Sequence, residues 1–308
     1  MGKGRQAAVD VGTNSVRLLV VEGDGTRLAR ELTITRLGRG VDETGHLDDE
    51  ALERTLETIA RYRRQWEQLG ASDVRIAATS AARDAADRDR FVAGVREVAG
   101  FEPEILSGEE EARTTFRGAT TALDVPRPTA VLDVGGGSTE IIVGGSDGDY
   151  VASVSLQLGC VRLTERRLPS DPPTISELAD ARVEIAAQLH RGAANLAEQG
   201  AHPSGCKVLV GVAGTVTTLA ALHLDLERYD DGRIHGARLS SMIVRRLGGQ
   251  LGSMPASERK RLGPLEAGRE DVIVAGALIV AGVLDHFGFS ELVVSEADSL
   301  DGLVLSRE

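Results

Sequence analysis

The chain has 308 residues, a formal net charge of −12, 42% hydrophobic residues and 27% charged residues. This length predicts two domains and is sufficient to bury a sizeable core. The acidic balance disfavours non-specific binding to nucleic acid or to an anionic membrane, although a local site can still bind an anion.

The cysteines and the apolar runs indicate the cellular compartment of the protein. The two cysteines have no spacing typical of a metal site, and the start of the chain lacks the apolar stretch of a signal peptide. The longest apolar run, residues 272–284, contains two glycines and is too short to span a bilayer. These features predict a reduced, cytoplasmic protein with no membrane partner.

The first predicted element is a β-hairpin over residues 7–21, AAVDVGTNSVRLLVV. Its polar turn is made of Gly12, Thr13, Asn14 and Ser15. Backbone N–H groups at such a turn, with hydroxyls and an amide beside them, can wrap phosphate oxygens. The same residue types also suit a tight hairpin that binds nothing.

The next segments alternate helices and strands. Apolar spacing predicts a helix over residues 49–69, then a strand over 74–79, a helix over 89–99 and a short strand over 102–106. Arg83, in the segment TSAARD, is placed either to grip a phosphate with two nitrogens or simply to lie on the surface.

Ser107 is predicted to cap a helix whose first turn carries Glu109, Glu110 and Glu111. Acidic side chains in a first turn interact favourably with the helix dipole. Composition alone therefore favours a solvated helix start over a chemical role for these glutamates.

After a linker with two prolines, the hairpin pattern returns over residues 130–144, AVLDVGGGSTEIIVG. Asp10 matches Asp133 and Ser15 matches Ser138, so the two copies lie 123 residues apart. The repeat predicts two similar domains, residues 1–125 and 126–308, facing each other across a cleft.

The second turn is made of Gly135, Gly136, Gly137 and Ser138. Three glycines cost backbone entropy and gain no packing, which makes sense where a ligand approaches the main chain. Asp133 before the turn and Glu140 after it would place two carboxylates near that ligand. Carboxylates repel phosphate unless a cation lies between, and Mg²⁺, or Mn²⁺, is the expected cation. The alternative is a glycine-rich hairpin with solvated acids.

The rest of the chain continues the α/β pattern. We expect a helix over 176–198, a strand over 207–212 that ends in a glycine-rich turn, and helices over 215–222 and 272–287. A strand over 291–295 and a last helix near 299–308, which can pack back on the first domain, complete the chain. Gly214 and Thr215 open one of these helices, where free N–H groups can bind an anion or merely start the helix.

Seven segments in this order resemble the exopolyphosphatase/guanosine pentaphosphate phosphohydrolase (Ppx/GppA) family: DVGTNSVRLLV, ATSAARDA, SGEEEAR, LDVGGGSTEI, GCVRLTER, GVAGTVTTLAA and EDVIVAGALI. The resemblance implies an α/β fold with two ribonuclease-H-like domains of the actin-like ATPase superfamily and an interdomain cleft. It favours the short, two-domain branch common in actinobacteria. One departure is Glu270, where a small residue is expected.

The resemblance also implies a role for each candidate residue. Glu111 matches the glutamate that activates the attacking water, with Glu110 as a rival, and Glu140 matches a second essential acid. Asp133 and Glu140 would hold the metal, and Asp10, the counterpart of Asp133, is a further candidate ligand. The phosphate-contacting positions are Gly12, Thr13, Asn14, Ser15, Arg83, Gly135, Gly136, Gly137, Ser138, Gly214 and Thr215.

The implied reaction is release of terminal orthophosphate from inorganic polyphosphate. The same chemistry on guanosine pentaphosphate (pppGpp) is an alternative, and the low aromatic content of 3% mildly favours polyphosphate. A non-catalytic polyphosphate or nucleotide sensor and a sugar-kinase-like phosphotransferase remain open. Family habit also allows a homodimer.

Overall fold

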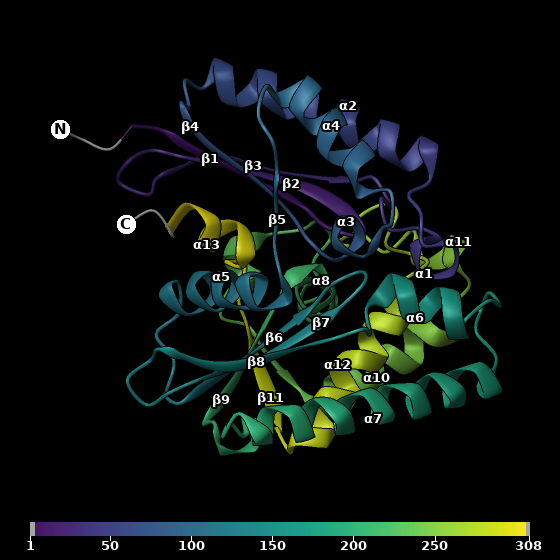
Figure 1. The fold of residues 1–308 in the computed structure, drawn as a ribbon. Helices are drawn as coiled ribbons and strands as arrows, with labels where there is room; N and C mark the ends of the chain where they lie inside the picture. The colour runs from purple at the N-terminus through teal and green to yellow at the C-terminus, as the bar shows by residue number, and fades with distance from the viewer. Residues whose placement is uncertain (1–3, 306–308) are drawn as a thin grey trace. The chain divides into compact units, whose positions relative to one another are not determined.

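The computed structural model describes residues 4–305 and contains two compact units (Figure 1). The first unit runs up to Gly118 and includes the helix that starts at Ser299; the second covers Ala119–Asp298. The boundary falls inside helix α5 (Gly108–Thr121), a few residues before the position expected from the sequence. The last residues of the expected final helix, 306–308, lie outside the described residues.

The sheet of the first unit has the order β3-β2-β1-β4-β5. Strand β1 pairs antiparallel with β2 and parallel with β4, so a hairpin is followed by crossover connections. The strands are β1 (Gln6–Val11), β2 (Ser15–Val21), β3 (Arg27–Ile34), β4 (Asp73–Ala78) and β5 (Glu104–Ile105).

Helices cover both faces of this sheet (Figure 1). On one face α2 packs through a buried stripe that includes Ile59, Tyr62 and Trp66, and the side chain of Asp48 accepts a hydrogen bond that caps its start. On the other face α13 packs through Leu300 and Leu303. The helices are α1 (Val41–Thr44), α2 (Asp49–Gln68), α3 (Ser80–Asp84), α4 (Arg88–Ala99), α5 and α13 (Ser299–Leu305).

The second unit repeats the same strand arrangement. Its sheet has the order β10-β11-β9-β6-β7-β8, so from β8 to β11 it follows the pairing of the first sheet and adds β10 at the edge. The strands are β6 (Thr129–Val134), β7 (Thr139–Gly144), β8 (Tyr150–Leu156), β9 (Val208–Val212), β10 (Arg238–Ser240) and β11 (Glu291–Val294). The expected α/β class with two ribonuclease-H-like halves is confirmed.

The core of the second unit is built around helix α12, which is buried over most of its length. It packs against α7 and α10. The helices are α6 (Cys160–Arg167), α7 (Ile175–Glu198), η1 (Pro203–Gly205), α8 (Ala213–His223), α9 (Asp231–Ile234), α10 (Ser241–Ser253), α11 (Ala256–Arg259) and α12 (Ile273–Phe287). Within the described part of the chain, no helix is both long and apolar enough to cross a bilayer.

One predicted turn is wrong. The glycine-rich turn expected after residue 212 does not form, because Gly211 lies in β9 and Gly214 in the first turn of α8. Strand passes directly into helix at Ala213, which adopts a left-handed φ of 65°. A non-glycine residue in this region is unusual and indicates local backbone strain.

Candidate functional site

The two hairpin turns have the same backbone geometry. In the first, the N–H of Gly12 donates to the carbonyl of Ser15 over 2.9 Å; in the second, the N–H of Gly135 donates to the carbonyl of Ser138 over 3.0 Å. The sequence repeat is therefore a structural repeat at the level of single hydrogen bonds.

In the first turn, the carbonyl oxygens point into a supporting loop. The carbonyl of Asn14 accepts hydrogen bonds from the N–H groups of Thr35 and Arg36, and that of Thr13 accepts one from Gly38. Gly38 must be a glycine for this contact, since a Cβ would lie 2.2 Å from the Thr13 side chain. With the carbonyls held this way, a ligand would meet the amide side of the turn.

The start of α6 supports the second turn. The N–H of Cys160 donates to the carbonyl of Gly135, and that of Val161 donates to Gly136, both over 2.9 Å. Gly159 permits this approach, because a Cβ there would lie 2.2 Å from the oxygen of Gly136. The first N–H groups of α6 are thus used to hold the turn and do not form a separate anion site.

Glu111 is held by Arg83. It lies in the first turns of α5 with 7% of its surface exposed, and Nη1 of Arg83 donates to its Oε2 over 3.0 Å. The same nitrogen donates to the carbonyl of Leu106 over 2.9 Å, which fixes the guanidinium. Beside them, the hydroxyls of Thr13 and Ser80 are 2.8 Å apart. Arg83 therefore orients Glu111, and its expected contact with phosphate stays a prediction.

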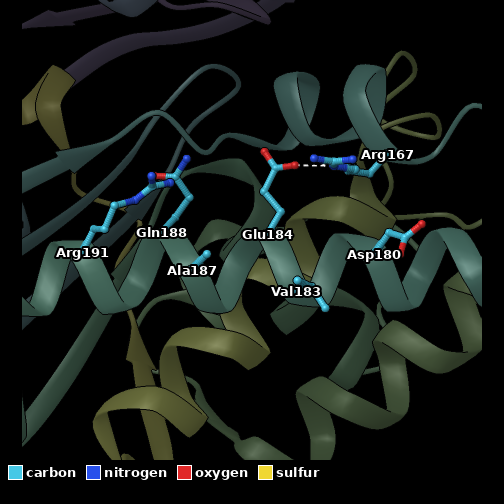
Figure 2. A pocket seen from close by; sticks show the side chains of 7 residues that line it. All are labelled: Arg167, Asp180, Val183, Glu184, Ala187, Gln188 and Arg191. Atoms are coloured by element: carbon cyan, nitrogen blue, oxygen red, sulfur yellow. Dashed lines mark hydrogen bonds and ion pairs between the residues drawn. The ribbon is translucent and has the colours of Figure 1, made fainter.

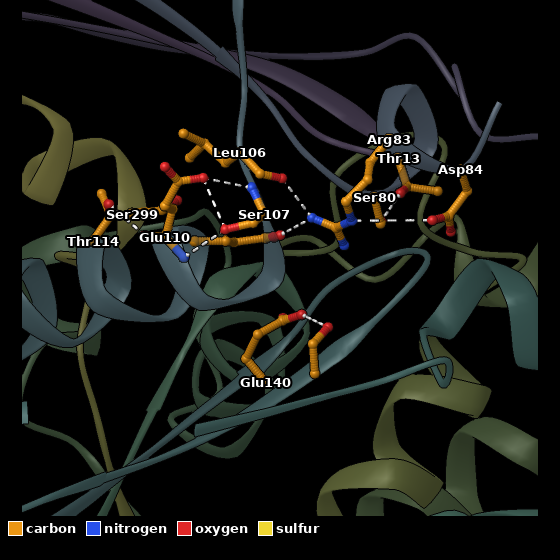
Figure 3. Close-up of polar contacts among 12 residues, drawn as sticks. Thr13, Ser80, Arg83, Asp84, Leu106, Ser107, Glu110, Thr114, Glu140 and Ser299 are labelled. Carbon is orange, nitrogen blue, oxygen red and sulfur yellow. Dashed lines mark hydrogen bonds and ion pairs between the residues drawn. The ribbon is translucent and has the colours of Figure 1, made fainter. Parts of the chain in front are cut away.

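Glu110 forms a capping box with Ser107. Its carboxylate accepts hydrogen bonds from the N–H and the hydroxyl of Ser107, each over 2.8 Å, and the hydroxyl accepts one from the N–H of Glu110 (Figure 3). The predicted cap at Ser107 is confirmed. These bonds lower the pKa of Glu110, the backbone N–H contributing most. Glu110 therefore has a structural role, which leaves Glu111 as the better candidate base.

Asp10 is engaged by a cation of the protein itself. Its Oδ2 accepts hydrogen bonds from Nη2 of Arg17, opposite it on β2, and from the hydroxyl of Ser299 on α13 over 3.1 Å. Asp10 is 5% exposed, so Arg17 compensates a buried charge.

The corresponding pair in the second unit consists of two acidic residues instead of an acid and a base. Asp133 lies opposite Glu140 on β6 and β7, with 7% and 1% of their surfaces exposed. Residues directly opposite in an antiparallel pair project from the same face with Cβ atoms about 5 Å apart. Glu140 thus occupies the position that Arg17 holds in the first unit, and two buried carboxylates face each other.

Such a pair fits a divalent cation. Two adjacent buried carboxylates are costly unless a cation or a proton neutralises them. Among the described residues there is no cluster of three or more His, Cys, Asp or Glu suited to a metal. Mg²⁺ suits this donor set, since it is usually held by one or two carboxylates together with substrate phosphates and water.

Gly214 and Thr215 lie close to this end of the second sheet. The strand before them, β9, pairs with β6 so that Val212 stands next to Asp133. The guanidinium of Arg269 lies against Gly214, where a Cβ would come within 1.9 Å of Nη1. Arg269 places a cation at the start of α8, where helix N–H groups already favour anions.

Arg269 was not among the residues singled out from the sequence. Its nearest carboxylate is Glu266, with Nε and Oε2 3.7 Å apart, and only 12% of its side chain is exposed. The unexpected Glu270 also has an explanation: its Oε2 accepts a hydrogen bond from the N–H of Gly268 and so shapes the loop that carries Arg269. In the sequence, Arg269 directly precedes the matched segment EDVIVAGALI and lies outside it.

A hollow on the outside of the second unit lies apart from these residues. It is formed by α7 and the end of α6, where Arg167 pairs with Glu184 (Figure 2). Burial raises the pKa of Glu184, but the ion pairs with Arg167 and Arg166 outweigh it and lower the pKa. None of the residues singled out above lines this hollow.

Comparison with known proteins defines the class. A model of the Ppx/GppA phosphatase family matches residues 19–308. The chain is 40% identical over 319 aligned positions to Exopolyphosphatase 2 of Mycobacterium tuberculosis, covering 98% of both chains. The chain therefore belongs to the Ppx/GppA phosphatase family, and the expected phosphoric anhydride hydrolase is confirmed.

Solved structures agree with this assignment. The crystal structure of an exopolyphosphatase-like protein superposes with a TM-score of 0.92 at 32% identity, covering 98% of both chains. The Ppx/GppA family member of Aquifex aeolicus gives a TM-score of 0.81 at 29% identity, covering 99% of this chain and 97% of the other.

Proposed function

We propose that this protein is an exopolyphosphatase that releases orthophosphate from the end of inorganic polyphosphate. The observation that carries the proposal is the buried Asp133–Glu140 pair beside a glycine turn, an arrangement suited to a cation-bound phosphate. The relative from M. tuberculosis bears the name of this activity and aligns over nearly the whole chain.

In this proposal, one set of residues binds the phosphate groups and another residue accepts the proton of the attacking water. The amide groups of the turns at Gly12–Ser15 and Gly135–Ser138, with Arg269 and the start of α8, bind the phosphate oxygens. Glu111, oriented by Arg83, accepts a proton as the oxygen of a water molecule attacks the terminal phosphorus. The bond from phosphorus to the bridging oxygen breaks, and the shortened chain leaves.

Asp133 and Glu140 would hold the cation, with Mg²⁺ favoured and Mn²⁺ an alternative. When bound, the cation neutralises phosphate charge in the ground state and on the leaving chain. Asp10 is the weaker candidate ligand, because Arg17 already supplies a positive charge to it. We assign Asp10 the role of holding Arg17 next to the first turn.

Phosphate release from polyphosphate, pppGpp and ATP, side by side with Mg²⁺ or Mn²⁺, tests the proposal. The expected result is metal-dependent release with the highest kcat/KM for polyphosphate. A clear preference for pppGpp would indicate that the protein is a guanosine pentaphosphate phosphohydrolase that uses the same chemistry. Binding of polyphosphate without turnover under any of these metals would instead indicate a sensor, and ADP formation with a sugar acceptor would indicate a kinase.

A further inference from the structure

Three side chains form a row across the second sheet. Asp133 on β6 stands opposite Glu140 on β7, and Glu140 stands opposite Ser155 on β8. Opposed residues project from one face, so the row places a hydroxyl beside the acid pair. The hydroxyl of Ser155 donates to Oε1 of Glu140 over 2.7 Å.

Burial makes this contact important. Glu140 is 1% exposed, so bulk solvent contributes little to the orientation of its carboxylate, and its side chain has several rotatable bonds. A buried carboxylate requires hydrogen-bond donors, and a donor on a neighbouring strand also fixes its direction. Ser155 meets both needs from β8, the edge strand that pairs with β7.

The first unit provides an internal comparison. There the row reads Asp10 on β1, Arg17 on β2 and Leu32 on β3. Where the middle position is an arginine, its neighbour is an apolar residue; where the middle position is a glutamate, its neighbour is a serine. The hydroxyl therefore accompanies the acid and is not a requirement of the repeated fold.

We infer that Ser155 is a positioning residue for Glu140, holding its carboxylate in the orientation that binds the cation. This inference rests on the proposed function. Side chains that orient metal ligands in this way typically contribute about 10- to 100-fold to metal affinity or activity.

The test compares four variants of the full chain: S155A, S155T, S155V and S153A. Threonine and valine have the same shape and both suit a strand, but only threonine keeps the hydroxyl. Ser153 is a matched control, since it projects from the same face two residues earlier and its hydroxyl pairs with Tyr150. Mn²⁺ affinity, measured by calorimetry without substrate, and phosphate release from polyphosphate are the two readouts.

The expected result is a 10- to 100-fold loss of Mn²⁺ affinity in S155A and S155V, with a parallel fall in kcat/KM. S155T and S153A should stay within a few fold of the parent protein. Equal Mn²⁺ affinity of S155V and S155T would overturn the inference while leaving the proposed function intact. Absence of phosphate release by the parent protein would refute the proposed function itself. If S155A proves unstable, the comparison of S155T with S155V decides the question.

Discussion

At the residue scale, two adjacent glutamates in α5 have different roles because of helix geometry. Successive residues on a helix point about 100° apart, so Glu110 turns back to Ser107 while Glu111 turns inward to Arg83. Their shared chemistry cannot distinguish them. Only the partners supplied by the fold show that Glu110 caps the helix and that Glu111, the proposed base, pairs with Arg83.

The variants E111Q and E110Q test this division. E111Q should lower kcat for polyphosphate at least about 100-fold, because a positioned base contributes roughly 10²–10⁴-fold. E110Q should keep kcat within a few fold, since that side chain only caps the helix. Steady-state phosphate release measures both. A large loss of kcat in E110Q with little effect in E111Q would reverse the assignment.

Glu110 should also make stability depend on pH. Its folded pKa lies below the ordinary value of 4.5, so its contribution is present above that pH and is lost as pH falls through the folded pKa. The melting temperature of E110Q should therefore lie slightly below that of the parent protein at pH 7, and the difference should shrink below about pH 4.5. A difference that stays constant down to pH 3.5 would contradict the role of the charged cap.

The two thiols should react slowly in the folded protein. Burial raises the pKa of Cys206 to about 11, and burial raises that of Cys160 despite opposing effects of Arg269 and Thr215. A raised pKa leaves little thiolate at pH 8, and the thiolate is the reactive form. A colorimetric disulfide reagent should label both cysteines quickly in urea and only slowly in buffer. Rapid labelling of either native thiol would show that the thiolate is exposed.

At the element scale, local patterns predicted those helices and strands in which apolar residues recur at the spacing typical of the element. The two hairpins and the helix at 49–69 agree with the prediction within one or two residues, and the last helix starts at the expected residue. Strands β3 and β8 were not predicted, because their half-buried, mixed residues form strands only when β2 and β7 offer an edge.

Glycine was the least reliable signal for turns. The turn expected after residue 212 does not form, and Gly211 lies in β9, where a Cβ would come within 2.9 Å of Val216 and 3.0 Å of Leu292. Here the missing side chain serves packing between elements. Arg269 was missed for a related reason: its contact with Gly214 joins segments far apart in the sequence, so no local pattern contains it.

A pair of glycine variants tests how tightly α13 packs. Gly302 lies on α13, where a Cβ would come within 1.9 Å of the carbonyl of Thr114 on α5. G302A should therefore destabilise the protein by about 1–3 kcal/mol through overpacking. Gly249, in the middle of α10, has no atom within 4 Å of its Cβ position, so G249A should stabilise by up to about 1 kcal/mol.

Urea denaturation of both variants provides the measurement. Opposite signs for the two changes in unfolding free energy are expected. Stabilisation by G302A would show that α13 does not pack against α5 as described.

At the scale of the whole molecule, a duplicated fold carries two different versions of one charged pair. Each unit presents a hairpin turn, an aspartate before it and an opposed residue on the next strand. In one unit the opposed residue is Arg17, so the pair joins an acid and a base; in the other it is Glu140, so the pair consists of two buried acids, which are the proposed ligands of the cation. The sequence repeat, with its offset of 123 residues, predicted the duplication and aligned positions 17 and 140, and the strand register showed that each lies opposite its aspartate.

The most direct test of the central claim follows the length of a polyphosphate chain during hydrolysis. With Mg²⁺, the protein should release orthophosphate from the outset, one unit for each unit by which the chain shortens, and E111Q should nearly abolish both changes while still binding polyphosphate. Shorter fragments appearing before orthophosphate, or full activity in E111Q, would contradict hydrolysis at the chain end by Glu111.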